Sequence, residues 1–104
     1  MRGEKNRMDI VFEVIDKNKR KIYLSKETWR HIRKRHPEIN NFEEIKEALI
    51  NPTKITGYNL DETIIYYYKY FKYKKSPEKY LLVIVKYLNT RGFVITAYFE
   101  KIIK

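Results

Sequence analysis

The chain has 104 residues, enough for one domain with one core. It carries 23 lysines and arginines against 13 acidic residues, a net charge of +10, so a polyanion such as nucleic acid is the favoured partner class. The absence of cysteine excludes disulfides and thiolate metal sites and favours the cytoplasm, and no apolar run approaches the roughly 20 residues of a membrane span.

The N-terminal third predicts a loose lead followed by a β-hairpin. Residues 1–7 are polar, lack the apolar region of a signal peptide, and are expected to form a flexible basic lead. Residues 9–15 and 21–24 are rich in β-branched and aromatic side chains and predict two strands. The polar segment 16–20 between them predicts the turn of the hairpin.

Two helices are predicted next. Ser25 is a good N-cap, and Glu27 complements the dipole of a helix running from about 26 to 35. Pro37 disfavours helical backbone at the preceding residue, so this helix should end there. Asn41 predicts the cap of a second helix, which the dipeptide 51–52 ends.

The remainder of the chain predicts strands. Residues 54–58 are a weak candidate, whereas 63–71, 80–87 and 93–101 are strong ones joined by short connections. The expected fold class is therefore α+β: an N-terminal β-hairpin and two helices packed on one face of a C-terminal antiparallel sheet of about four strands.

Period-2 alternation sorts the last strand into two faces. One face, expected in the core, comprises Phe93, Ile95, Ala97 and Phe99, and the other comprises Val94, Thr96, Tyr98 and Glu100. Lys86 and a row of tyrosines in residues 66–70 could share the second face. The alternative is that these tyrosines are simply good strand formers on a solvated face.

Both histidines of the chain lie in one basic segment, residues 29–38. Imidazole titrates near neutral pH, so either ring could give or take a proton beside a phosphate. On a regular helix His31 and His36 point about 140° apart, so they converge only if Pro37 breaks the helix first. Their spacing does not suit a zinc pair, and no metal site is expected. The alternatives are a solvated His31 and a His36 that stabilises the helix C-terminus.

Several segments taken in order resemble a known group of nucleases. They are Trp29 to Glu38, Phe42 to Pro52, Tyr66 to Lys69, Tyr80 to Lys86 and Gly92 to Tyr98. This order resembles the small phage and mobile-element domains of the barnase–EndoU–colicin E5/D–RelE-like (BECR) superfamily. The resemblance covers roughly residues 20–100 and implies a single nuclease-like domain over 1–104 that cleaves RNA, often tRNA or mRNA, without a metal or other cofactor.

The resemblance also implies which residues act. The implied catalytic residues are His31, Arg35, His36, Lys86, Thr96 and Tyr98. The candidate RNA-binding residues are Arg30, Arg33, Lys34, Tyr66, Tyr68 and Lys69. A toxin-like nuclease of this kind would pair with an acidic antitoxin or immunity protein.

The expected reaction is attack of a ribose 2′-hydroxyl on the adjacent phosphorus, with histidine acid/base catalysis. Two alternatives use the same basic and aromatic surface: a nucleic-acid-binding module without chemistry, and an interaction protein.

Overall fold

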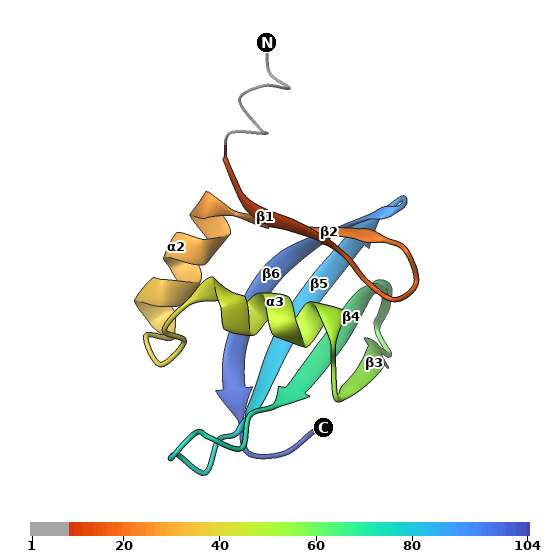
Figure 1. The fold of residues 1–104 in the computed structure, drawn as a ribbon. Helices are drawn as coiled ribbons and strands as arrows, with labels where there is room; N and C mark the ends of the chain where they lie inside the picture. The colour runs from red at the N-terminus through yellow and green to blue at the C-terminus, as the bar shows by residue number, and fades with distance from the viewer. Residues whose placement is uncertain (1–8) are drawn as a thin grey trace.

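The computed structural model describes residues 9–104, so the expected basic lead at 1–7 lies outside the described residues. The elements are β1 (Ile10–Ile15), β2 (Lys21–Ser25), α2 (Lys26–Arg35), α3 (Phe42–Ile50), β3 (Lys54–Tyr58), β4 (Asp61–Tyr70), β5 (Tyr80–Leu88) and β6 (Arg91–Glu100) (Figure 1). The fold is α+β, as expected. Neither helix in the described range is long and apolar enough to cross a membrane.

The sheet is larger than expected and is mixed rather than antiparallel. Within residues 9–104 its six strands lie in the order β1-β2-β6-β5-β4-β3, and only the pair β2–β6 among them is parallel. The expected sheet of about four strands is therefore corrected in two ways. The N-terminal hairpin adds β2 to the edge of β6, and the weak segment 54–58 forms the edge strand β3. Two parallel strands need a long crossover connection, and the connection from β2 to β6 includes both helices. Consecutive strands usually pair with each other, so this rule does not predict the pairing of β2 with β6.

The two helices form where their caps predict them. The Ser25 side chain accepts a hydrogen bond from the backbone N–H of Thr28 at 3.0 Å, and α2 ends at Arg35, just before the C-cap residue His36. Asn41 occupies the N-cap of α3, although its side chain makes no capping hydrogen bond. The sequence therefore predicts both ends of α2 and both ends of α3 to within a residue.

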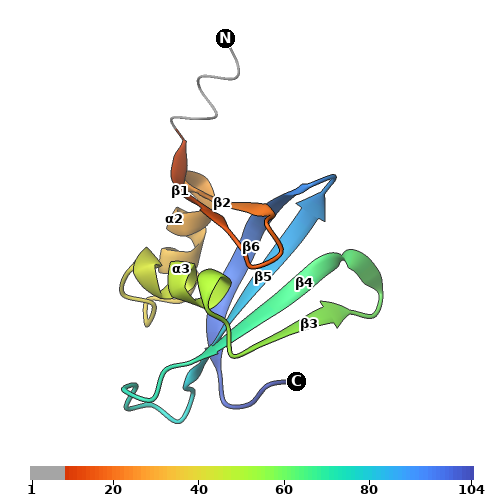
Figure 2. The ribbon, with the colours of Figure 1, turned by 45° about the vertical axis from the view of Figure 1, so that its right-hand side comes forward.

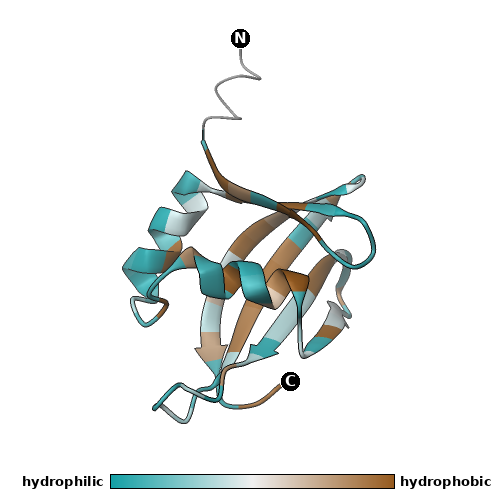
Figure 3. Cartoon of the chain, viewed as in Figure 1, coloured by the Kyte–Doolittle hydropathy of each residue, from teal (hydrophilic) through white to brown (hydrophobic). Residues whose placement is uncertain are grey.

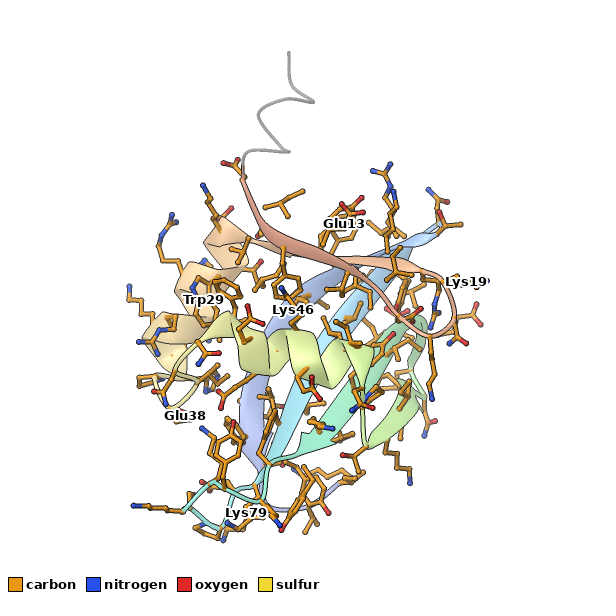
Figure 4. The ribbon with its side chains drawn as sticks, in the orientation of Figure 1. Glu13, Lys19, Trp29, Glu38, Lys46 and Lys79 are labelled. Atoms are coloured by element: carbon orange, nitrogen blue, oxygen red, sulfur yellow. The ribbon has the colours of Figure 1, made fainter. Side chains whose placement is uncertain are left out.

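Both helices lie on the same side of the sheet (Figures 1 and 2). The core between the helices and the sheet contains Ile32 of α2, Ile45 and Leu49 of α3, and Val83 and Val85 of β5. Trp29 lies between α2 and α3, with its ring 5.8 Å from that of Phe42 (Figure 4). We call the opposite side of the sheet, which no described helix covers, the outer face.

A β-bulge in β6 changes which side chains face the core. The register shifts between Ile84 and Val85 of β5, which gives β6 one extra residue at this point. The sequence placed Phe93 and Ile95 in the core and Val94 outside. The structure reverses this, since Val94 is 4% exposed while Phe93 and Ile95 are 39% and 47% exposed. An inserted residue inverts the alternation on one side of the bulge, and a period-2 pattern does not reveal it.

The register defines the residues of the outer face. Cross-strand partners point to the same side, and the pairs include Tyr66–Ile84, Ile84–Thr96, Tyr68–Leu82, Leu82–Tyr98, Lys86–Phe93 and Tyr23–Phe93. The sequence-based expectation that Lys86, Thr96, Tyr98 and a row of tyrosines share one face is therefore met. Phe93 and Tyr23 belong to this face as well.

A buried polar cluster ties the β1–β2 turn to the middle of the sheet. The Asp16 carboxylate accepts hydrogen bonds from the Arg20 guanidinium at 3.1 Å and from the Tyr67 hydroxyl at 3.0 Å, and the Tyr67 and Tyr87 hydroxyls lie 2.5 Å apart. The backbone amides of Asn18 and Arg20 each donate to the same carboxylate at 2.9 Å. Burial alone would raise the pKa of Asp16, but these hydrogen bonds and the Arg20 charge outweigh it and hold that pKa below its usual range.

Gly92 lies in close contact with the side chains around it, and we expect a side chain at this position to destabilise the fold. A Cβ there would lie 2.7 Å from a ring carbon of Tyr87 and 2.9 Å from Val85 Cγ1. The Gly92→Ala variant should lose about 1–3 kcal/mol of unfolding free energy, because Tyr87 is held by its hydrogen bonds and cannot move aside. Gly57→Ala is the matched control, since a Cβ on Gly57 meets nothing within 4 Å. Equal urea denaturation midpoints for the two variants would contradict this packing.

The buried carboxylate also makes a pH-dependent contribution to stability. Asp16→Asn should lower the free energy of unfolding by about 2–3 kcal/mol at neutral pH, because it leaves the Arg20 charge without its partner. Since the folded-state pKa of Asp16 is lowered, this contribution is present above the ordinary value of 3.8 and is lost as the pH falls through the folded-state value.

Urea titrations of both proteins as a function of pH would check this expectation. The stability difference should be constant around neutral pH and shrink in acid. Glu62→Gln, at an exposed carboxylate, is the control and should show no such difference. A wild-type advantage over Asp16→Asn that persists undiminished at the lowest pH would show that the charge of Asp16 is not its source.

Candidate functional site

Helix α2 presents a row of cations to solvent. Lys26, Arg30, Lys34 and Arg35 are exposed, and within residues 9–104 none of them forms an ion pair with a carboxylate. Only Ile32 of this helix is fully buried, which leaves most of its circumference hydrophilic (Figure 3). Uncompensated charge on one helix is the electrostatic signature expected of a phosphate-binding surface.

The C-terminal end of α2 brings His36 to the outer face. β2 pairs with only the first three residues of β6, and α2 packs along the part of β6 that follows. The His36 ring therefore reaches around this edge and contacts Tyr98, with 5.3 Å between ring centroids. The Glu38 carboxylate lies 3.7 Å from Nδ1 of the same ring. His36 is 29% exposed, so the ring is held on two sides but still open to a ligand.

Thr96 and Tyr98 are the two hydroxyl-bearing candidates on β6. Both lie on the outer face of β6, two residues apart, and both are partly exposed. Burial is the main cause that raises the pKa of Tyr98, with further contributions from Glu100 and Tyr66. The Tyr98 phenol is therefore protonated at neutral pH and is available as a hydrogen-bond donor.

His31 does not join this group. It is exposed on α2, and the helix ends only after Arg35, so the two histidines keep the separation of a regular helix. Arg35 is exposed at the last position of α2 and directly precedes His36 in the chain. The structure therefore brings the His36 ring into contact with Tyr98, on the face of β6 that also presents Thr96, and leaves His31 outside.

Lys86 lies on the outer face but its charge is already paired. Its ammonium group lies 3.2 Å from the Asp61 carboxylate. The pKa of Asp61 is lowered to about 2, first by hydrogen bonds from Thr63 and then by Lys86, so the partner is fully ionised at neutral pH. A bound anion would therefore compete with Asp61 for the Lys86 ammonium group.

The predicted aromatic residues divide into exposed and buried ones. Tyr66 is partly exposed and stacks on Tyr58, with ring centroids 5.9 Å apart and planes 12° apart. Tyr68 is only 1% exposed, so it cannot stack on a base in this conformation, and its hydroxyl accepts a hydrogen bond from the backbone N–H of Lys104. Lys69 lies on the helix-covered side of the sheet and pairs with Glu47 at 3.6 Å.

Sequence reasoning missed four residues of this surface. Tyr58 is the stacking partner of Tyr66, and Glu38 is the carboxylate at His36. Tyr23 and Phe93 form an exposed aromatic pair, 5.7 Å between centroids, farther along the outer face. Only Glu38 carries a sequence signal, its place two residues after His36; the others depend on strand register. Among the described residues, no cluster of three or more His, Cys, Asp or Glu side chains is placed to hold a metal ion.

Arg33 was expected to contact RNA, but its hydrogen bonds give it a structural role. Its Nη1 donates to the backbone oxygens of Pro37 at 2.9 Å and Ile39 at 2.7 Å, which fixes the loop that contains His36. Arg33→Ala should therefore cost about 1 kcal/mol of unfolding free energy. Lys34→Ala, at the neighbouring exposed position, should change it by no more than about 0.5 kcal/mol. Equal urea denaturation curves for the two variants would contradict this role.

The geometry of this surface is the basis for any assignment of function. Comparison with protein-family models, with curated proteins and with solved structures finds no match to this chain. The resemblance to BECR nucleases therefore remains a hypothesis drawn from sequence motifs. The contact of His36 with Tyr98, beside a cationic helix, is the observation on which a proposal can be built.

Proposed function

We propose that the protein is a metal-independent endoribonuclease that cleaves single-stranded RNA at the His36–Tyr98 end of α2. The observation that carries the proposal is the contact between these two rings, at 5.3 Å, on a surface that also presents Thr96. An imidazole, a phenol and an aliphatic hydroxyl within one small area offer a proton acceptor and two hydrogen-bond donors. A phosphodiester with an adjacent 2′-hydroxyl can use all three.

His36 is suited to the role of general base. The carboxylate of Glu38 faces Nδ1 at 3.7 Å and favours a proton on that nitrogen, which leaves Nε2 free to accept one. In the proposed reaction His36 takes the proton of the ribose 2′-hydroxyl while the 2′-oxygen bonds to phosphorus. The bond from phosphorus to the 5′-oxygen breaks, and that oxygen receives a proton from Tyr98. The products are a 2′,3′-cyclic phosphate and a 5′-hydroxyl.

The remaining candidate residues would bind the RNA and stabilise the negative charge of the transition state. Arg35, the residue before His36, would compensate the charge that develops on the phosphoryl oxygens. Arg30 and Lys34 extend the cationic row along α2 for flanking phosphates. The exposed stacked pair of Tyr58 and Tyr66 offers a platform for an unpaired base, as expected for a protein that binds single-stranded RNA.

The proposal is tested by incubating the purified protein with single-stranded RNA in EDTA. We expect cleavage that yields 2′,3′-cyclic phosphate ends, and His36→Ala should slow it at least about 100-fold, as expected on loss of a general base. His31→Ala is the matched control, because it removes the other imidazole of this segment and leaves the contact between His36 and Tyr98 intact. It should reduce the rate far less.

Two outcomes would contradict this reaction. Full activity of His36→Ala would exclude the proposed base, and RNA fragments ending in 3′-hydroxyls would exclude attack by the 2′-oxygen. Tyr98→Phe separates binding from chemistry, because it keeps the ring that contacts His36 and removes only the hydroxyl. It should slow cleavage while leaving unchanged the affinity for an uncleavable 2′-O-methyl RNA.

The second candidate function is RNA binding without cleavage. The ion pair of Lys86 with Asp61 favours it, because it removes from the outer face a cation that was expected to stabilise the transition state. Steeply salt-dependent binding of RNA, with no fragments from the wild-type protein, would support this alternative.

A further inference from the structure

An open groove lies at the end of α2 opposite to His36. Its volume is about 910 Å³, and its lining includes Glu13, Tyr23, Glu27, Arg30, Arg91 and Phe93. These residues come from β1, β2, the first turns of α2 and the start of β6. Figure 4 labels Glu13 of β1, which lines the groove, and Glu38, which lies in the loop after α2 together with His36.

The floor of the groove is aromatic. Tyr23 and Phe93 are cross-strand partners in the parallel β2–β6 pair, and their rings stack at 5.7 Å with planes 29° apart. Phe93 is 39% exposed, although an isolated apolar ring of this size is normally buried. Exposed, pre-stacked rings in an open groove offer a face on which another flat, unsaturated ring can stack.

The rim of the groove carries both signs of charge. Arg30 and Arg91 are exposed, and the Arg91 guanidinium lies 5.9 Å from the Tyr23 ring centroid. Glu27 is exposed and makes no ion pair with any residue in 9–104, whereas Glu13 pairs with Lys21 at 3.5 Å. Guanidinium groups suit a phosphate, and a free carboxylate accepts hydrogen bonds from the amino group of a base.

We infer that this groove binds an unpaired nucleotide of the same RNA strand that is cut at His36. The inference rests on the proposed function and specifies the substrate further. From Ser25 to His36, α2 spans about 16 Å, and the stretch of β6 from Phe93 to Tyr98 spans a similar length. The bound nucleotide therefore lies a few nucleotides from the cleaved phosphate, and the intervening backbone follows the cationic face of α2.

The chemistry of the rim also selects the base. Glu27 can only accept hydrogen bonds when ionised, so it favours bases that present an exocyclic amino group, namely adenine, cytosine and guanine. Uracil has no exocyclic amino group and offers only its ring N3–H as a donor. The groove should therefore bind an adenine or cytosine oligonucleotide more tightly than a uracil oligonucleotide of equal length.

Binding of short fluorescent 2′-O-methyl oligonucleotides, which cannot be cleaved by 2′-attack, tests the groove directly. Phe93→Leu and Tyr23→Leu keep apolar bulk but remove the stacking surface, and each should weaken binding of oligo-A about tenfold. Tyr70→Leu is the matched control, because Tyr70 is an exposed tyrosine (43%) that contacts the Tyr80 ring at a tilt of 55° and does not line the groove. Thermal unfolding of each variant verifies that it is folded.

The outcomes separate this inference from the proposed function. If Phe93→Leu and Tyr23→Leu, both folded, bind oligo-A as tightly as Tyr70→Leu, the groove is not the nucleotide site, whether or not the wild type cleaves RNA. If Phe93→Leu and Tyr23→Leu bind oligo-A weakly but the wild type cleaves no RNA, the groove is supported as a nucleotide-binding site. The same result contradicts the proposed cleavage at His36. Glu27→Gln should reduce the preference for oligo-A and oligo-C over oligo-U, and an unchanged preference would overturn the assignment of Glu27.

Discussion

The short parallel pairing between β2 and β6 determines how the rest of the molecule is arranged. It covers only the residue pairs from Lys21–Arg91 to Tyr23–Phe93. Because β2 then ends and leads directly into α2 through the cap residue Ser25, the helix continues along the edge of β6 in place of a strand. A longer β2 would have paired with the rest of β6 and separated α2 from the outer face.

This arrangement explains why α2 contributes to the core on one side of the sheet and to the candidate site on the other. The buried Ile32 of α2 packs in the core, while His36 at its end reaches a tyrosine of the outer face. Arg33 and the loop that follows hold the histidine there, and Lys74 donates to the backbone oxygen of Glu38 from the β4–β5 loop. We call the line of contact between α2 and β6 the seam. The candidate site lies at one end of this seam and the aromatic groove at the other.

The parts of the fold that the sequence predicts are those encoded by local chemistry. Ser25 and Pro37 define the ends of α2, and the strong strands β4, β5 and β6 are evident from their β-branched and aromatic content. Strand partners and side-chain faces are non-local. The parallel β2–β6 pair requires closure over both helices, and the bulge at Val94 and Ile95 exchanges core and outer residues without any change in composition.

The same distinction applies to the site. The sequence predicts one catalytic group of six residues: His31, Arg35, His36, Lys86, Thr96 and Tyr98. In the structure Thr96 and Tyr98 share the outer face and the His36 ring contacts Tyr98, whereas His31 lies apart. The burial of Tyr68, the ion pair of Lys86 and the structural hydrogen bonds of Arg33 depend on neighbours distant in sequence or on loop geometry, so residue type alone could not reveal them.

The central claim is that RNA lies along the seam between α2 and β6 on the outer face. Nuclear magnetic resonance of the labelled protein, titrated with an uncleavable 2′-O-methyl oligonucleotide, tests this claim residue by residue. The account predicts signal changes at His36, Thr96 and Tyr98, along α2, and at Phe93. Changes confined to the β4–β5 loop or the β3 edge, with none at these residues, would contradict it.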